Sequence, residues 1–164
     1  MSFYESYLFP PVMEWATRGF RRQIADLIGQ AKGRVLEIGA GTGANLGYYQ
    51  EGVKEVVGIE PVEAMLEKAR RVASTTAHGV PISLATGDAR VLPFADGEFD
   101  TVVACLVFCT IPEPEKAARE AFRVLKPGGR LVFFEHVVSP HQRTRAWQQR
   151  LNPVWCKVAC GCEI

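Results

Sequence analysis

The sequence predicts an α/β fold in which a doubly wound, mostly parallel sheet is covered by helices on both faces. Apolar runs typical of buried strands alternate with segments of helical periodicity along most of the 164 residues. The first such run ends in a glycine-rich turn over residues 39–43, and the second ends in Glu60, 21 positions after Gly39. In a doubly wound sheet, a glycine turn and an acid at this spacing meet at the carboxyl ends of neighbouring strands.

The first half of the chain supplies the elements around this turn. Residues 12–29 place apolar side chains on one stripe, which predicts an amphipathic helix. Short apolar runs over residues 34–38 and 56–60 predict buried strands. Pro61 suits the first position of the next helix, whose inner face is expected to hold Val62, Met65, Leu66, Ala69 and Val72.

The second half continues the alternation. Strands are expected near residues 81–85 and over 99–105. A helix over residues 113–125 is expected to end at Lys126-Pro127-Gly128-Gly129 and to face inward with Ala117, Ala118, Ala121, Phe122 and Leu125. A fifth strand over residues 130–136 follows, and then a polar loop and a helix over 145–158.

The glycine turn and Glu60 predict a ligand that contains a nucleoside. Gly39, Gly41 and Gly43 leave bare backbone N–H groups facing a ligand at a sharp turn. The Glu60 carboxylate can accept hydrogen bonds from the two hydroxyls of a ribose. A tight turn without any ligand is the structural alternative.

Glu37 separates two ligand classes that share this geometry. Gly39, Gly41 and Ala44 also satisfy the spacing of dinucleotide-binding folds. A carboxylate at Glu37 would repel a pyrophosphate, but it can pair with the ammonium of an amino-acid moiety. S-adenosylmethionine carries an ammonium, a ribose and an adenine, and it has no phosphate. The pattern therefore favours S-adenosylmethionine, unless Glu37 only caps a neighbouring loop.

Later motifs make a family resemblance specific. They follow the turn in a fixed order: Gly87-Asp88-Ala89, Leu92-Pro93-Phe94, Phe99-Asp100-Thr101-Val102-Val103 and Arg123-Val124-Leu125-Lys126-Pro127-Gly128-Gly129. In this order and spacing, residues 34–136 resemble the class I S-adenosylmethionine-dependent methyltransferases. The resemblance implies a Rossmann-like sheet of seven strands, S-adenosylmethionine as cofactor, S-adenosylhomocysteine as product, and Asp88 and Ala89 near the adenine.

A set of site residues follows from the pattern and the resemblance together. The residues expected to bind the cofactor are Glu37, Gly39, Ala40, Gly41, Gly43, Asn45, Glu60, Pro61, Met65, Asp88, Ala89 and Cys105. The expected reaction is in-line transfer of the methyl group to a small-molecule acceptor, for which the protein supplies alignment and a dry site. His136 is a weak candidate for a general base, and a structural histidine at a strand end is its alternative.

A narrower resemblance concerns the acceptor. Residues 43–45, 104–109 and 134–137, and parts of 147–162, are similar to the small thiol S-methyltransferases of the microsomal alkyl-thiol type and their bacterial relatives. This resemblance implies a thiol or another soft nucleophile as acceptor. The N-terminal membrane anchor of the animal members has no counterpart in this sequence, so no membrane span is expected.

The chain is expected to form one domain over residues 1–164. It divides into an N-terminal lid and helix (1–30), the cofactor-binding core (34–136) and a C-terminal part (137–164) that lacks the family's antiparallel strands 6 and 7. An uncovered fifth strand exposes backbone groups, which favours a homodimer through that edge. Two alternatives remain for the function: a non-catalytic, cofactor-binding regulatory subunit and a dinucleotide-dependent oxidoreductase.

Composition excludes some partners. A net charge of +1 disfavours nucleic acid, because phosphate recognition needs a basic excess. Five cysteines without a signal peptide indicate reduced thiols and a cytoplasmic location. The spacing of Cys156, Cys160 and Cys162 does not match a zinc motif, so no metal is expected. Cys105 and Cys109 are expected to pack near the cofactor rather than to act as nucleophiles.

Overall fold

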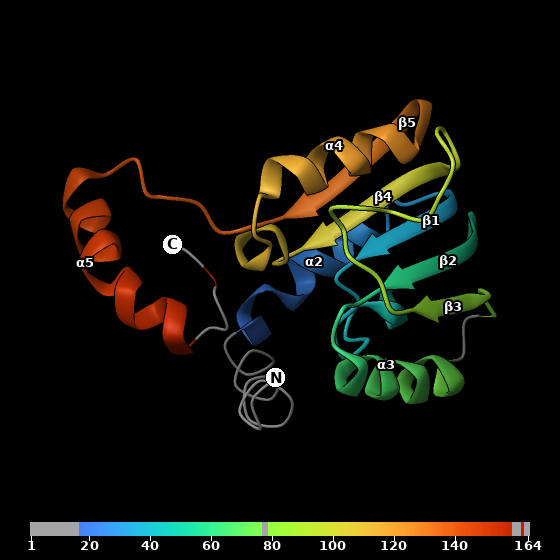
Figure 1. Cartoon of the computed structure of the whole chain (residues 1–164). Helices are drawn as coiled ribbons and strands as arrows, with labels where there is room; N and C mark the ends of the chain where they lie inside the picture. The colour runs from blue at the N-terminus through green and yellow to red at the C-terminus, as the bar shows by residue number, and fades with distance from the viewer. Residues whose placement is uncertain (1–16, 77–78, 159–161, 163–164) are drawn as a thin grey trace.

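The core of the molecule is a sheet of five parallel strands in the order β3-β2-β1-β4-β5 (Figure 1). A computed structural model of the chain describes residues 17–76, 79–158 and 162. The strands are β1 (Gly33–Ile38), β2 (Val53–Ile59), β3 (Ile82–Ala85), β4 (Phe99–Cys105) and β5 (Leu125–Phe134). The strand order reverses next to β1, which confirms the predicted doubly wound α/β class.

Strand β5 begins earlier than residue 130, where the sequence places its start. Leu125 already pairs with Phe99 of β4, and pairing then resumes with Arg130 opposite Thr101. The four residues between them form an insertion in the strand, where Gly128 adopts a positive φ of 79°. The predicted helix-ending turn is therefore a bulge inside β5, because both sides of it pair with the same neighbouring strand.

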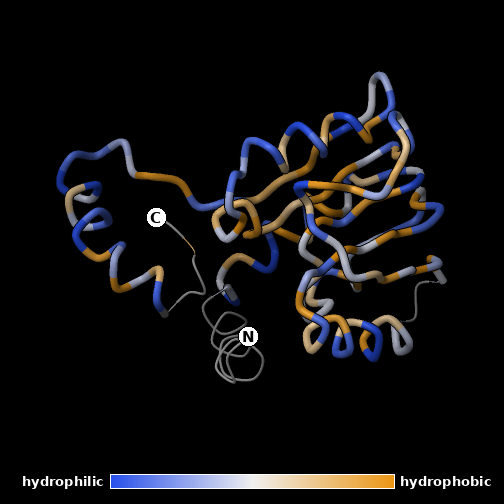
Figure 2. The backbone as a smooth tube through the Cα atoms, viewed as in Figure 1, coloured by the Kyte–Doolittle hydropathy of each residue, from blue (hydrophilic) through white to orange (hydrophobic). Residues whose placement is uncertain are grey.

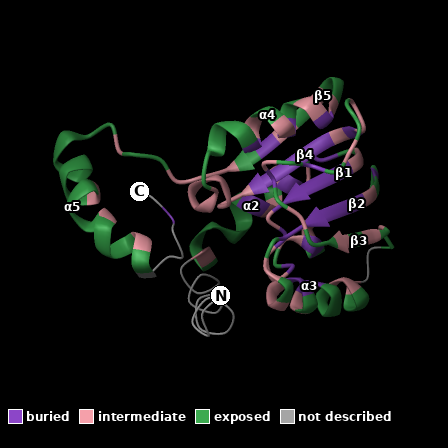
Figure 3. Cartoon of the chain, viewed as in Figure 1, coloured by how far each residue is buried: buried purple, intermediate pink, exposed green. Residues whose placement is uncertain are grey.

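Helices cover both faces of the sheet. They are α2 (Arg21–Ile28), α3 (Glu63–Thr75) and α4 (Pro114–Val124). The chain also has a later helix, α5 (Gln142–Val158), and single turns of 3-10 helix at η2 (Arg18–Phe20), η3 (Leu46–Tyr48) and η4 (Phe108–Thr110). Helices α2 and α3 pack on one face around Val35 and Val56, while α4 packs on the other around Leu36 and Val57. Figure 3 shows the resulting burial of β1, β2 and β4.

Two residues that the sequence places on the sheet-facing sides of helices are exposed instead. Phe122 of α4 is 64% exposed and Val72 of α3 is 38% exposed. The buried residues of α4 are Ala117, Ala121 and Val124. Phe122 follows Ala121 directly, and one residue is about 100° of turn in a helix, so its side chain faces solvent. In α3, Ala73 occupies the inner position instead of Val72.

The part of the chain after β5 departs from the sheet. Residues 135–141 lead to α5, which stands apart from the strands in Figure 1, and Figure 2 shows that this connection includes an apolar stretch. Among the described residues no strand is antiparallel to the sheet, and β5 forms one of its edges. Phe133 on this edge is 57% exposed. Pairing of two copies through β5 stays a prediction.

The N-terminal lid, the division of the chain into three parts and its location stay predictions. The predicted lid lies largely in residues 1–16, outside the described residues. Of the helix predicted over residues 12–29, the described part starts at Thr17 and is divided into the 3-10 turn η2 and the α-helix α2. The division into lid, core and C-terminal part therefore stays a prediction, as does the cytoplasmic location. Within the described ranges, no helix is long and apolar enough to cross a bilayer.

Candidate cofactor site

A cavity of about 600 Å³ lies at the carboxyl ends of β1, β2 and β4. Since β1 lies between β2 and β4, this is the place where the strand order reverses and where ligands bind in open α/β sheets. Most of the predicted site residues line it: Gly39, Ala40, Gly41, Asn45, Glu60, Pro61, Met65, Asp88, Ala89, Cys105 and His136. Glu37 and Gly43 do not belong to its wall.

The three glycines of the turn have different roles. All three have positive φ, at 71° for Gly39, 54° for Gly41 and 84° for Gly43. A Cβ at Gly39 would overlap the Val107 side chain, and one at Gly43 would lie 3.0 Å from Ala69 Cα. A Cβ at Gly41 would meet only the carbonyl oxygen of Gly39, at 3.9 Å. Gly39 and Gly43 therefore allow close packing within the protein, whereas Gly41 leaves space in the cavity.

Glu60 is fixed in the cavity wall at the end of β2. Its Oε2 accepts a hydrogen bond from the Gly41 N–H at 3.0 Å, and its Oε1 accepts one from the Val62 N–H at 3.0 Å. Burial raises the pKa of Glu60, while these two backbone donors act in the opposite direction. An ionised carboxylate has about four acceptor positions, so both oxygens can still accept hydrogen bonds from ribose hydroxyls.

Glu37 lies behind the cavity wall. It is 1% exposed, and its two oxygens accept hydrogen bonds from Asn45 Nδ2 and Tyr49 Oη, both at 2.9 Å. Burial raises the pKa of Glu37 to about 7, although both hydrogen bonds lower it. Glu37 positions Asn45, which does line the cavity. Its pairing with an ammonium group stays a prediction, and the loop contacts foreseen as the alternative are present.

Asp88 and Arg90 form an ion pair at the rim of the cavity. The Arg90 guanidinium donates to Asp88 Oδ2 at 2.7 Å, and the Arg90 backbone N–H donates to Oδ1 at 2.8 Å. These bonds hold the pKa of Asp88 below its usual range, so its carboxylate is an acceptor at neutral pH. Arg90 also lines the cavity, and sequence reasoning missed it because a lone arginine after a motif carries no spacing signal.

Glu135 holds the loop at the end of β4. Its Oε1 accepts hydrogen bonds from the Val107 N–H at 2.7 Å and the Phe108 N–H at 2.9 Å. At the end of β4, just before this loop, burial and the carboxylates of Glu37 and Glu135 raise the pKa of the Cys105 thiol to about 12. The thiol is therefore protonated at neutral pH, in agreement with the expected packing role and against a nucleophilic one.

His136 lines the cavity just after β5. Its Nε2 lies 3.4 Å from Cys162 Sγ, and Cys162 is only 3% exposed. A role for His136 as general base stays a prediction. Cys156 lies elsewhere and donates to Asn152 Oδ1 at 3.5 Å, while Cys160 lies outside the described residues. Cys156 and Cys162 therefore have different partners.

Comparisons with known proteins agree with this geometry. Residues 36–133 match the model of the methyltransferase domain family. Thiol S-methyltransferase TMT1B of Rattus norvegicus is 37% identical over 157 residues, which are 93% of this chain and 63% of that protein. Demethylmenaquinone methyltransferase of Renibacterium salmoninarum is 38% identical over 120 residues, 73% of this chain and 48% of that protein.

The fold is also found in solved structures. An S-adenosylmethionine-dependent methyltransferase of Thermotoga maritima superimposes with a TM-score of 0.65 at 25% identity, covering 92% of this chain and 68% of that one. The chain spans somewhat under two thirds of the thiol S-methyltransferases that it matches, 63% of the rat protein and 62% of the human one.

Proposed function

The chain belongs to the methyltransferase domain family, and from this premise we propose that it transfers a methyl group from S-adenosylmethionine to a small-molecule acceptor. The observation that carries the proposal is the cavity at the strand-order reversal, into which Gly41 and Glu60 both face. This position and this pair of residues suit a ligand with a ribose, and the carboxylate of Glu37 behind the wall disfavours one with a pyrophosphate.

The residues of the cavity fit the cofactor. Gly41 leaves a space that a Cβ would occupy, and the fixed carboxylate of Glu60 is next to it because the two residues are hydrogen-bonded. Glu60 would accept hydrogen bonds from the ribose hydroxyls, and Asp88 would accept one from the exocyclic amine of adenine. We expect the buried carboxylate of Glu37 to attract the ammonium group of the cofactor. Asn45, whose amide donates to this carboxylate, lines the cavity in front of it.

The protein's share of the chemistry is binding and alignment. When bound, S-adenosylmethionine supplies an electrophilic methyl group on a positively charged sulfur. The glycine turn, Glu60 and the β4 loop fix where that group would lie, because each is tied to the rigid carboxyl end of a strand. Orientation of two reactants can contribute about 7–11 kcal/mol of a barrier, so no nucleophilic residue of the protein is required.

A thiol or another soft nucleophile is the acceptor that we propose. The cavity lining includes the apolar residues Leu106, Val107 and Ile111, which suit an uncharged, partly apolar acceptor. The relatives named thiol S-methyltransferases, which align with most of this chain, support the same choice.

An acceptor panel tests the proposal. The purified protein is incubated with S-adenosylmethionine and, in turn, a thiol, an amine, a phenol and a hydroquinone, and release of S-adenosylhomocysteine is measured. We expect release above background with the thiol. Tight cofactor binding without turnover of any acceptor would instead support the non-catalytic regulatory subunit.

A further inference from the structure

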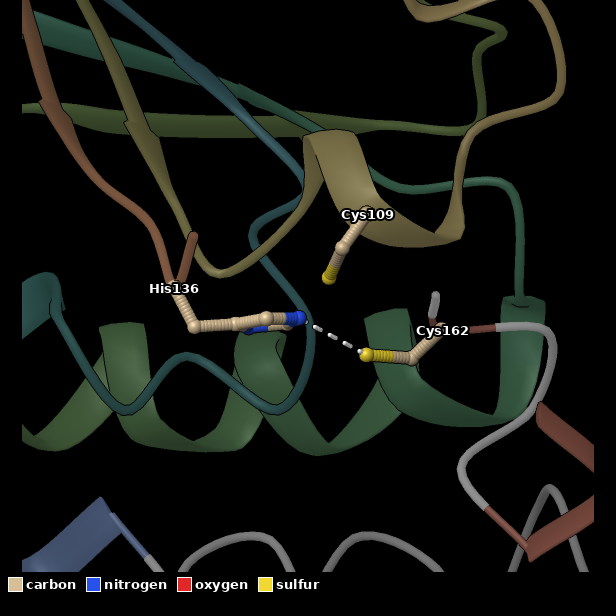
Figure 4. A group of neighbouring side chains, drawn as sticks. All are labelled: Cys109, His136 and Cys162. Atoms are coloured by element: carbon tan, nitrogen blue, oxygen red, sulfur yellow. Dashed lines mark hydrogen bonds between the residues drawn. The ribbon is translucent and has the colours of Figure 1, made fainter. Parts of the chain in front are cut away.

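Three side chains from distant segments converge at one end of the cavity. Cys109 lies in η4, His136 follows β5, and Cys162 lies near the C-terminal end of the chain. Figure 4 shows the three side chains pointing toward one another, and their ligand atoms all lie within 4.8 Å of one another. Among the residues that the structure describes, this is the group with the composition of a metal site.

We propose that Cys109, His136 and Cys162 bind a thiophilic divalent cation, for which zinc is the expected ion. Two thiolates and one imidazole form a donor set typical of zinc, and soft sulfur ligands select against magnesium and calcium. Three protein ligands leave the fourth position of a tetrahedral ion open, as in catalytic zinc sites.

The distances suit this ion. With Zn–S of about 2.3 Å and Zn–N of about 2.0 Å, neighbouring ligand atoms of a tetrahedral site lie about 3.5–3.8 Å apart. Cys162 Sγ and His136 Nε2 are already 3.4 Å apart. With every pair of ligand atoms within 4.8 Å, a shift of about 1 Å by the Cys109 side chain would complete the geometry.

The surroundings support a bound thiolate. Trp155 Nε1 donates a hydrogen bond to Cys162 Sγ at 3.3 Å, and N–H donors of this kind orient and stabilise metal-bound sulfur. Cys162 is 3% exposed, so water does not compete freely at this ligand. Cys109, His136, Trp155 and Cys162 all line the cavity, so an ion held by the three ligands would lie in the cavity that we propose for the acceptor.

This location gives the metal a function that rests on the proposed methyl transfer. An acceptor thiol binds at the open position, loses its S–H proton to solvent and is held as a thiolate. Its sulfur then forms a bond to the methyl carbon, and the electron pair of the broken carbon–sulfur bond stays on the cofactor sulfur. The neutral thioether product is a weaker ligand and dissociates. His136 is then a metal ligand and not a general base.

The first experiment measures metal binding itself, without activity. The full chain is reduced, freed of metal with a chelator, desalted and titrated with Co²⁺. We expect one ion per chain, the visible bands of tetrahedral Co²⁺ and thiolate-to-cobalt charge-transfer bands in the near ultraviolet. Cys109→Ser, Cys162→Ser and His136→Ala should each weaken Co²⁺ binding at least about 100-fold. Loss of a residue that is only hydrogen-bonded to a metal ligand already lowers metal affinity about 10–100-fold, and these three would bind the ion directly.

Cys156→Ser is the matched control. Cys156 lies in the same C-terminal region, but its thiol contacts Asn152 rather than the cluster, so this variant should bind Co²⁺ like the parent. Circular dichroism checks that each variant is folded, and the parent's own stoichiometry decides the proposal even if a variant unfolds. Absence of Co²⁺ and Zn²⁺ binding by the reduced parent, or binding unchanged in Cys109→Ser and Cys162→Ser, would overturn the site.

A second experiment separates the metal from the proposed function. Addition of 2-mercaptoethanol to the Co²⁺ protein should strengthen the charge-transfer bands, because a further thiolate enters the open position. Unchanged bands, or thiol methylation that continues at full rate in metal-free protein, would overturn the acceptor role while leaving the methyltransferase proposal intact. Cobalt binding with the expected spectrum but no methyl transfer to any acceptor would instead count against the proposed function alone.

Discussion

Replacement of Gly41 by alanine tests where the cofactor lies. An added Cβ would meet no protein atom closer than the Gly39 carbonyl oxygen at 3.9 Å, so the fold has room for it. The φ of 54° remains, and a non-glycine residue in this region costs roughly 1–2 kcal/mol. The Cβ would occupy cofactor volume, and overpacking of about 1–3 kcal/mol corresponds to a 5- to 150-fold loss of affinity. Gly41→Val should abolish binding.

Two other glycines provide controls. Gly128 has a φ of 79° and open space around it, far from the cavity in the β5 bulge, so Gly128→Ala should lose similar stability and keep full affinity. Gly39→Ala should be the least stable variant, because its Cβ would overlap Val107. Urea unfolding and calorimetry with S-adenosylhomocysteine measure both quantities. A folded Gly41→Val protein that binds this ligand as tightly as the parent would refute our placement of the site.

The remaining predictions concern three side chains of the site. Glu60→Gln should lower the affinity for S-adenosylhomocysteine by roughly 1.5–3 kcal/mol. It should also lower the free energy of unfolding by about 1–3 kcal/mol, because one of its two backbone partners loses its acceptor. Glu67→Gln, at an exposed position of α3, is the control for both quantities. For Glu37, a native pKa of about 7 against 4.5 means that the folded state keeps a proton that the unfolded state releases between these values. Stability should therefore fall as pH rises from about 4.5 to 7, by about 3 kcal/mol in total. Glu37→Gln should remove this slope, and parallel stability–pH curves for the two proteins would contradict the assignment. Cys105→Ala should turn over as fast as the parent, because a thiol with a pKa of about 12 is not a nucleophile at neutral pH. Loss of turnover with intact cofactor binding would contradict this packing role of Cys105.

The parts of the fold that depend on local pattern were predictable from sequence. Strand β4 has its predicted bounds, and the glycine turn and Glu60 meet where the topology rule places them. The apolar run of β4 and the glycine turn are each contained in fewer than ten consecutive residues, so neighbouring residues alone determine them. The bulge in β5 was not predictable, because its four residues have the same composition as an ordinary helix-ending turn.

Contacts between distant residues account for most of what the sequence missed. The hydrogen bond between Glu37 and Tyr49 depends on how the loop after the glycine turn folds back, which no periodicity reports. Cys162 was grouped with the two cysteines that precede it closely. In the structure it instead approaches His136, 26 positions earlier, and Cys109. The latter two are close to each other because the ends of β4 and β5 are adjacent. Arguments from ligand spacing cannot detect a group that the sheet brings together.

Ligand-dependent stability tests the central claim most directly. At a hundredfold excess over its dissociation constant, a ligand that binds only the folded state stabilises it by about 2.7 kcal/mol. For a chain of 164 residues this corresponds to a rise in melting temperature of roughly 5–11 °C. We expect S-adenosylhomocysteine to produce this rise and NADH to produce none. A larger rise with NADH than with S-adenosylhomocysteine would contradict the account.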